Sequence, residues 1–417
     1  MPAPLYKWYV VGMLWWICFF NYADRQAVFS VFPLLEKEFG LTLEQLGWLG
    51  SSFGMVYGLC APFAGRVVDR VRRKSAILGG LHAWSAVCMA TALSRGFGPL
   101  LVFRAAEGLG ETFYFPASMS LLSDYHGKAT RSRALGLHQT SVYIGTIAGG
   151  YFAGLVGQRF GWRWTFVVFG GLGIMLGLVL RRHVIEPERG AADALAGSLV
   201  TKIDHGSRGR GARGWLTPTL VILLAAFLCA NFVAVVALTW MPKFLYDKFH
   251  LSLATAGLTA TVFIQLASMA GAPAGGWLAD RLRARRPGGR MMVQATGLVC
   301  GAPFVALCGL TQSIAWLIVA LTAWGFFKGL YDANIFAAMF DVVPPESRGA
   351  ATGLMNMAGW LGGGAAAPVA IGYIAERRGL GFAISLASVV YVAGAALLIA
   401  GIVVFIRRDA ERMEPGR

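Results

Sequence analysis

The chain has 417 residues, 56% of them hydrophobic and only 14% charged, and its formal net charge is +16. Because a soluble globular domain carries about 25% charged residues, this composition excludes an ordinary soluble protein and predicts a polytopic membrane protein. An excess of Lys and Arg is expected on the cytoplasmic loops of such a protein, so it does not indicate nucleic-acid binding.

Twelve stretches are apolar over the length of about 20 residues that a membrane-spanning helix needs. They predict an all-α fold of twelve transmembrane helices in two six-helix halves, 1–182 and 215–417, joined by a polar linker, 183–214. The first half contains 7–33, 43–68, 75–94, 98–122, 131–158 and 162–182. The second contains 215–242, 252–279, 290–311, 314–341, 347–374 and 380–406.

Basic residues are concentrated on alternate loops. Clusters follow the second and eighth predicted helices, the linker is basic, and the tail begins with Arg407 and Arg408. The loop after the first predicted helix instead carries Glu36, Lys37, Glu38 and Glu44, and is mainly acidic. Since cytoplasmic loops are enriched in Lys and Arg, both termini should face the cytoplasm. The first apolar run is too long for a cleavable signal peptide.

The basic loops contain a repeat. The stretch G-R-V-V-D-R-V-R-R-K begins at Gly65, and G-W-L-A-D-R-L-R-A-R-R begins at Gly276, each at the end of the second helix of its half. A chance match at equivalent positions is improbable, so the repeat indicates an internally duplicated transporter. The residues expected to act in its conformational change are Gly65, Asp69, Arg70, Arg73, Gly276, Asp280 and Arg281.

An acid and a base lie side by side in the first predicted helix. Asp24 and Arg25 interrupt an otherwise uncharged run from Trp8 to Phe32. A charge at the bilayer centre costs between roughly 2.5 and 17 kcal/mol, so such residues are functional candidates. Adjacent helical residues point about 100° apart, which favours different partners for the two side chains. The alternative is a self-neutralising pair.

The fourth predicted helix carries Arg104, Glu107 and Glu111 at positions i, i+3 and i+7, which share one helix face. Helix rise places Asp24 and Arg25 near the depth of Arg104, with Glu111 at least one turn closer to the cytoplasm. Arg104 is either a substrate contact or a structural partner of Glu107 or Glu111.

In the second half, Lys328 and Asp332 share a face of the tenth predicted helix at positions i and i+4. They are a substrate contact, a gate or a structural pair, and these alternatives stay open. Tyr331 and Asn334 lie beside them.

These residues suit the transport of an anion with a proton. The guanidinium of Arg binds a carboxylate with two parallel hydrogen bonds, and intramembrane acids act as proton relays. The predicted partners are therefore a small anionic substrate, protons and the lipid bilayer, in a monomer without cofactor, metal or nucleic acid. The candidates for substrate binding are Arg25, Tyr22, Arg104, Lys328, Tyr331 and Asn334, and those for proton coupling are Asp24, Glu111, Glu107 and Asp332.

An enzyme is not expected, because the chain has no H-E-x-x-H or Walker lysine motif. The six cysteines all lie in apolar runs and are interpreted as packing residues.

The helix count, the repeat and the G-x-x-x-D-R loops resemble the major facilitator superfamily. Within it, N-Y-A-D-R at 21–25, and Arg104 followed by Glu111 and Phe115-Pro116-Ala117, resemble the anion:cation symporter group. This resemblance implies a symporter for a sugar acid or carboxylate in a bacterial inner membrane. It also implies that Arg25 binds the substrate and that Asp24 and Glu111 handle the proton.

A second resemblance is to the spinster-like lysolipid transporters, which share the N-Y-x-D-R motif and the E-P-x-R-G sequence found here at 186–190. A lysolipid or another amphipath is therefore the alternative substrate. A transporter-derived sensor is a further alternative, although no soluble signalling domain is evident in the sequence.

Overall fold

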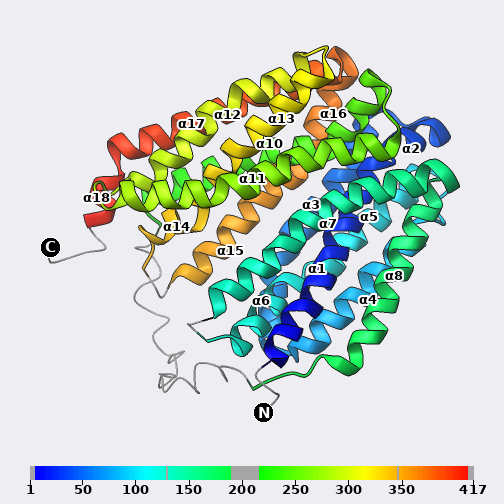
Figure 1. Cartoon of the computed structure of the whole chain (residues 1–417), viewed down its shortest axis with the longest axis horizontal. Helices are drawn as coiled ribbons and strands as arrows, with labels where there is room; N and C mark the ends of the chain where they lie inside the picture. The colour runs from blue at the N-terminus through cyan, green and yellow to red at the C-terminus, as the bar shows by residue number, and fades with distance from the viewer. Residues whose placement is uncertain (1–4, 128–129, 189–215, 345–346, 412–417) are drawn as a thin grey trace. The chain divides into compact units, whose positions relative to one another are not determined.

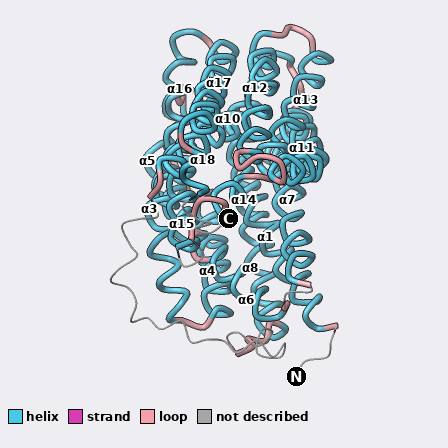
Figure 2. Tube along the Cα trace, turned by 90° about the vertical axis from the view of Figure 1, so that its left-hand side faces the viewer, coloured by secondary structure: helices cyan, strands magenta, loops and turns pink. Residues whose placement is uncertain are grey.

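The structure is a computed structural model that describes residues 5–127, 130–188, 216–344 and 347–411. In these ranges every regular element is a helix, and no strand occurs (Figure 2). Most of the expected linker, 189–214, lies outside the described residues, and so does the side chain of Asp69.

The helices of the first half follow the expected spans closely. Its second span, for example, begins at Leu43 as expected and ends at Arg70. The elements are α1 (Tyr6–Ser30), α2 (Phe32–Phe39), α3 (Leu43–Arg70), α4 (Arg73–Thr91), α5 (Phe97–Glu111), α6 (Tyr114–Tyr125), α7 (Arg131–Phe160) and α8 (Trp162–His183).

The second half has the same succession of long helices. Its elements are α10 (Pro218–Phe249), α11 (Leu253–Arg283), α12 (Gly289–Leu310), α13 (Ile314–Asp332), α14 (Ile335–Phe340), α15 (Arg348–Gly359), the π-helical η3 (Trp360–Ala365), α16 (Ala366–Arg378), α17 (Leu380–Val404) and α18 (Ile406–Glu411).

Within the described residues, seven helical segments are long and apolar enough by themselves to cross a membrane: α8, α10, α11, α12, α13 with α14, α15 to α16, and α17. The other five expected spans are α1, α3, α4, α5 with α6, and α7. Charged side chains interrupt several of these, as Asp24 and Arg25 interrupt α1. All twelve expected spans are thus helical.

Three expected helices are interrupted. Pro116 cannot donate to the carbonyl four residues earlier, and the fourth span breaks between α5 and α6 at Thr112 and Phe113. Between α13 and α14, the Asn334 side chain donates to the carbonyl of Leu330 (3.0 Å). In the eleventh span, η3 contains Gly362, Gly363 and Gly364, and π-helical segments occur often at functional sites.

The contacts divide the chain into two units. Unit 1 comprises Met1–Leu41, Met55–Gly206 and Leu251–Leu258, and unit 2 comprises Thr42–Gly54, Ser207–His250 and Thr259–Arg417. Helices α3 and α11 therefore each pass from one unit to the other. The sequence instead predicts the start of α3 in the first half and the start of α11 in the second half.

In unit 1, α1 and α7 run side by side (Figure 1). The approach depends on two glycines of α7 at i and i+4. A Cβ added at Gly145 would lie 2.5 Å from the carbonyl oxygen of Phe19, and one at Gly149 would lie 2.5 Å from the Cα of Ala23. Small residues allow membrane helices to approach at this distance. This contact fixes the position of the part of α1 that carries Asp24 and Arg25.

We expect Gly149→Leu to lower the apparent melting temperature in detergent, because an overpacked contact costs about 1–3 kcal/mol. The matched control is Gly136→Leu, since a Cβ at Gly136, also on α7, meets nothing within 4 Å. This control should be neutral or stabilising, because Leu favours helix more than Gly does by about 0.8 kcal/mol. Equal melting temperatures for the two variants would contradict the close contact.

The short helix α2 is fixed by a carboxylate. The Trp162 indole N–H and the Arg163 guanidinium each donate to Glu38 over 2.6 Å. Partial burial raises the pKa of Glu38, but these two hydrogen bonds and the charge of Arg163 outweigh it, so the pKa lies below its ordinary value of 4.5. The ionised carboxylate therefore stabilises the folded state above that pH.

We expect Glu38→Gln to lose this contribution, which is less than about 1 kcal/mol because the pair is partly exposed. Its melting temperature should lie below that of the wild type at neutral pH. The difference should vanish as the pH falls through the lowered pKa of Glu38, since the wild type then loses the same interaction. Melting curves across this pH range test it, and a difference that stays constant down to the most acidic pH would refute it.

Candidate functional site

The charged residues of α1 and α5 meet inside unit 1. The guanidinium of Arg25 forms an ion pair with Glu111, and its Nε donates to Glu111 Oε2 over 3.0 Å. Its Nη2 also donates to the Asn21 side-chain oxygen, one turn earlier on α1, over 3.2 Å. The Glu111 carboxylate is thus the counter-ion of Arg25.

Two aromatic rings flank this ion pair. The Arg25 guanidinium carbon lies 4.6 Å from the centre of the Tyr22 ring and 5.3 Å from that of Tyr57. A guanidinium within about 6 Å of a ring centre is attracted by the ring face. Tyr22 was a sequence candidate, whereas Tyr57, on α3, was not.

The second arginine of the site, Arg104, forms an ion pair with Glu107 one turn along α5. Both residues are 0% exposed. This geometry matches the structural-pair alternative for Arg104, with Glu107 as a partner.

Asp24 is the third acid of the site, and it is 2% exposed. In the described part of the chain it forms no ion pair, and its Oδ1 accepts no hydrogen bond. A carboxylate oxygen of Asp24, one of Glu107 and the Cys88 sulfur all lie within 4.8 Å of one another. Glu107 Oε1 also lacks a partner. Two buried carboxyl groups therefore lie close together without a cation between them.

These three groups could offer ligand atoms to a metal ion. Glu107 already accepts a hydrogen bond from the Arg104 guanidinium, whose positive charge would repel a cation at this position. A proton suits the pair better, because it neutralises one of two buried carboxylates that lie close together.

The depth of these contacts differs from the sequence expectation. The Arg25 guanidinium contacts Glu111, whose position on its helix was expected at least one turn closer to the cytoplasm. Side chains on a helix lean toward its N-terminus, and α1 and α5 are antiparallel if each crosses the membrane once in turn. Arg25 and Glu111 therefore lean toward each other. An estimate of depth from the helix rise per residue does not include this lean.

The candidates of the second half lie in unit 2. Lys328 and Asp332 form an ion pair along α13, and their side chains are 17% and 27% exposed. Tyr331 is buried, and the Asn334 amide donates to the carbonyls of Leu330 and Gly275. These bonds occupy both donors of Asn334.

The first repeated loop centres on Arg73. This residue is 2% exposed, forms ion pairs with Asp124 and Glu186, and donates to the carbonyl of Pro187 over 2.9 Å. It joins the start of α4 to the end of α6 and to the segment after α8. Arg70 of the same motif is exposed, and a Cβ at Gly65 would meet nothing within 4 Å.

The second loop repeats the arrangement. Arg290 pairs with Asp341 (2.6 Å) and with Asp280 (3.0 Å). The pair Arg290–Asp341 has the same sequence separation, 51 residues, as Arg73–Asp124. Arg281 lies over the exposed Trp277 ring at 5.6 Å, and the surroundings of Gly276 are open. The duplication therefore extends from the sequence to individual contacts.

Sequence reasoning missed Tyr57 and Cys88 in the site, and Asp124, Asp341 and Glu186 in the loops. Tyr57 and Cys88 lie in apolar helices where no spacing distinguishes them from packing residues. The conserved spacing of the two Arg–Asp pairs was a usable signal, since it can be found by aligning the two halves of the chain.

Comparison with known proteins agrees with the fold and the repeat. A model of the Major Facilitator Superfamily matches residues 14–367 and 288–417. The chain belongs to the major facilitator superfamily. Its predicted fold of twelve helices in two similar halves is thus confirmed, as is the prediction that it is a transporter and not an enzyme.

Relatives within the superfamily cover nearly the whole chain. The probable galactarate/D-glucarate transporter GudP of Bacillus subtilis is 27% identical over 89% of this chain and 86% of that protein. The D-galactonate transporter of Escherichia coli O6:H1 is 26% identical over 94% of this chain and 93% of that protein. A solved bacterial homolog of the human lysosomal transporter Spinster superposes with a TM-score of 0.85 at 21% identity, over 96% of this chain and 98% of that one.

Proposed function

We propose that this transporter is a proton-coupled symporter for a small organic anion, a sugar acid or another carboxylate. The relatives named for galactarate, D-glucarate and D-galactonate support this substrate class. One observation carries the proposal: an arginine held by a glutamate lies directly beside a buried aspartate that has no cationic partner.

Arg25 binds the anion in this proposal. Its guanidinium presents several donors in a planar fork that fits a carboxylate. Glu111 is the carboxylate already bound there, so a substrate carboxylate takes its place on Arg25. The Tyr22 and Tyr57 rings beside the guanidinium offer faces for the substrate carbon chain. Arg25 carries most of the affinity, and Arg104 acts through Glu107.

Asp24 and Glu107 share the transported proton. With every group ionised, the acids Asp24, Glu107 and Glu111 outnumber the bases Arg25 and Arg104 by one. An uncompensated charge in a buried site is costly, and one bound proton removes it. Asp24 Oδ1 and Glu107 Oε1 accept no hydrogen bond within the described residues, so each carboxyl has an oxygen that can take up the proton.

Coupling follows from the same charges. A monocarboxylate substrate such as D-galactonate that displaces Glu111 from Arg25 adds one negative charge to the site. This second negative charge opposes reorientation unless the proton is bound. Reorientation occurs by alternating access, in which the halves 1–182 and 215–417 rock about a central site. The paired loops around Arg73 and Arg290 stabilise one conformation through their ion pairs.

We also propose a location and an oligomeric state for the protein. The protein is a monomer in a bacterial inner membrane with both termini in the cytoplasm, as the distribution of basic loops favours. In unit 2, Lys328 and Asp332 form a gate or a second substrate contact.

Purified protein in proteoliposomes tests the proposal. With D-galactonate or D-glucarate outside, an inward proton gradient should drive accumulation, and dissipating the gradient with a protonophore should stop it. Accumulation that is unchanged by the protonophore would overturn the coupling. Transport of a labelled lysolipid, with no transport of any sugar acid, would instead favour the spinster-like alternative, for which the E-P-x-R-G sequence at 186–190 is the supporting observation.

A further inference from the structure

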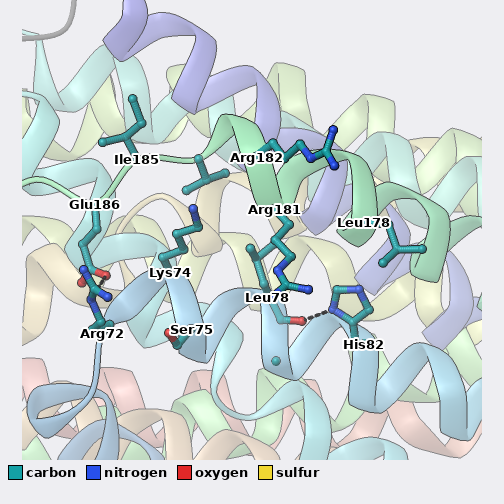
Figure 3. Close-up of a pocket in the computed structure, with 12 residues that line it drawn as sticks. Arg72, Lys74, Ser75, Leu78, His82, Leu178, Arg181, Arg182, Ile185 and Glu186 are labelled. Carbon is teal, nitrogen blue, oxygen red and sulfur yellow. Dashed lines mark hydrogen bonds and ion pairs between the residues drawn. The ribbon is translucent and has the colours of Figure 1, made fainter.

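A basic cavity lies on unit 1, away from the charged residues of α1 and α5. It has a volume of about 700 Å³ and lies between the start of α4 and the end of α8 (Figure 3). Its charged lining residues are Arg72, Lys74, Arg181, Arg182 and Glu186, with His82 beside them.

The packing of α4 against α8 sets the direction of these side chains. A Cβ at Gly177 of α8 would lie 2.6 Å from the His82 ring, so this face of α8 touches α4. Arg181 follows Gly177 by four residues and therefore lies on the same face. Figure 3 shows its guanidinium extending toward Leu78 and His82 of α4.

Helix α4 lines the cavity with one of its faces. Lys74, Leu78 and His82 are spaced by four residues, so they line one side of the helix. The His82 ring is held by a hydrogen bond between its Nδ1 and the Leu78 carbonyl (2.6 Å). Lys74 and Arg181 thus approach the same space from two helices.

The cavity keeps an excess of positive charge. Its one acid, Glu186, accepts the backbone N–H of Arg73 over 2.7 Å and lies 3.9 Å from Arg72. Across the ranges that the structure describes, no acidic partner is recorded for Lys74, Arg181 or Arg182. An anion is the ligand that satisfies these groups.

The surroundings favour a lipid over a free anion. Arg181 and Arg182 lie in the last turn of a membrane-spanning helix, where the headgroups begin. Toward the membrane centre, α8 exposes Met175, Leu178 and Val179, each more than half exposed. A cationic cavity at headgroup level, continuous with an apolar helix face, fits a phosphate with acyl chains attached.

We infer that this cavity binds the headgroup of an anionic phospholipid, with its phosphate between Lys74 and Arg181 and its acyl chains along α8. This site is separate from the substrate site and does not depend on which anion is transported.

Native mass spectrometry of the delipidated protein tests the inference, with dioleoyl-phosphatidylglycerol as the probe and dioleoyl-phosphatidylcholine as the neutral reference. Each cation at the membrane surface contributes a factor of about five to anionic lipid affinity. The variant K74Q/R181Q should therefore bind phosphatidylglycerol about twenty-five-fold more weakly. The control R407Q/R408Q removes two exposed charges from α18, which does not line the cavity, and should lose less phosphatidylglycerol affinity than K74Q/R181Q does.

A second pair of variants leaves every charge in place. Gly79 lines the cavity, and a Cβ there meets nothing within 4 Å, so Gly79→Leu fills the cavity without disturbing the helix contact. It should lose phosphatidylglycerol, whereas Gly171→Leu, on α8 and equally unobstructed, should retain it.

Equal losses in K74Q/R181Q and R407Q/R408Q would overturn the inference, since the effect would then be one of general charge. Full binding by Gly79→Leu would also overturn it. Displacement of the lipid by soluble glycerol 3-phosphate at equal concentration would show that the cavity takes a free phosphate, and would refute the lipid as its ligand.

Discussion

Replacing Arg25 by Gln should abolish measurable binding of the transported anion. The side chain would lose its charge and its fork of donors, and truncating one partner of a buried charged pair costs about 2–5 kcal/mol. An affinity loss of roughly thirty-fold to several thousand-fold follows, at 1.4 kcal/mol per factor of ten. Isothermal titration of D-galactonate or D-glucarate into the purified protein measures it.

The variant Arg25→Lys separates charge from geometry. It keeps the positive charge but presents a point charge without the planar fork, so it should bind the anion more weakly than the wild type and more tightly than Arg25→Gln. Because Arg25→Gln leaves Glu111 buried without its counter-ion, the double variant R25Q/E111Q controls for misfolding. Wild-type affinity in R25Q/E111Q would disprove the role of Arg25.

Replacing Glu107 by Gln should uncouple transport from the proton gradient. Gln keeps the shape of the side chain and removes one negative charge, so the site becomes neutral without a bound proton. The variant should exchange labelled for unlabelled substrate across the membrane but should not accumulate it under a proton gradient. Parallel exchange and gradient-driven uptake in proteoliposomes measure the two activities.

Glu111→Gln is the matched comparison, since it lies one turn further along α5 and carries the same change. Its effect should fall on substrate affinity, because Glu111 competes for Arg25. Asp24→Asn should behave like Glu107→Gln, since the two carboxyl groups are expected to share one proton. If Glu111→Gln uncouples transport while Glu107→Gln does not, the proton lies on Glu111 and the assignment proposed here is wrong.

The three helix interruptions were not predicted from the sequence, and their causes differ in how local they are. Pro116 breaks the fourth span near its own position, as expected for a residue that cannot donate to the preceding turn. The interruption at Asn334 was harder to anticipate, because it involves a bond to Gly275, 59 residues away, as well as one to Leu330. Whether an Asn continues a helix depends on which acceptors lie within reach of its amide.

The two repeated loops also combine features that the sequence predicts with contacts that only the structure shows. The two G-x-x-x-D-R motifs were visible in the sequence, but the residue that connects the most elements in the first loop is Arg73, and in the second it is Arg290. Their partners, Asp124 and Asp341, lie on segments far along the chain. Long-range ion pairs are not encoded by local spacing, and here only the equal spacing within the two halves could have suggested them.

By itself the sequence determined the twelve helices, the duplication and the identity of the charged residues of α1 and α5. Hydrophobic length and the periodicity of a helix are local properties, so they can be derived from the chain alone. Only the tertiary structure decided that Arg25 pairs with Glu111, that Arg104 pairs with Glu107, and that Asp24 is left beside Glu107 and Cys88. These pairings depend on how closely α1 approaches its neighbours and on the lean of each side chain, and a shift of one helical turn would exchange them.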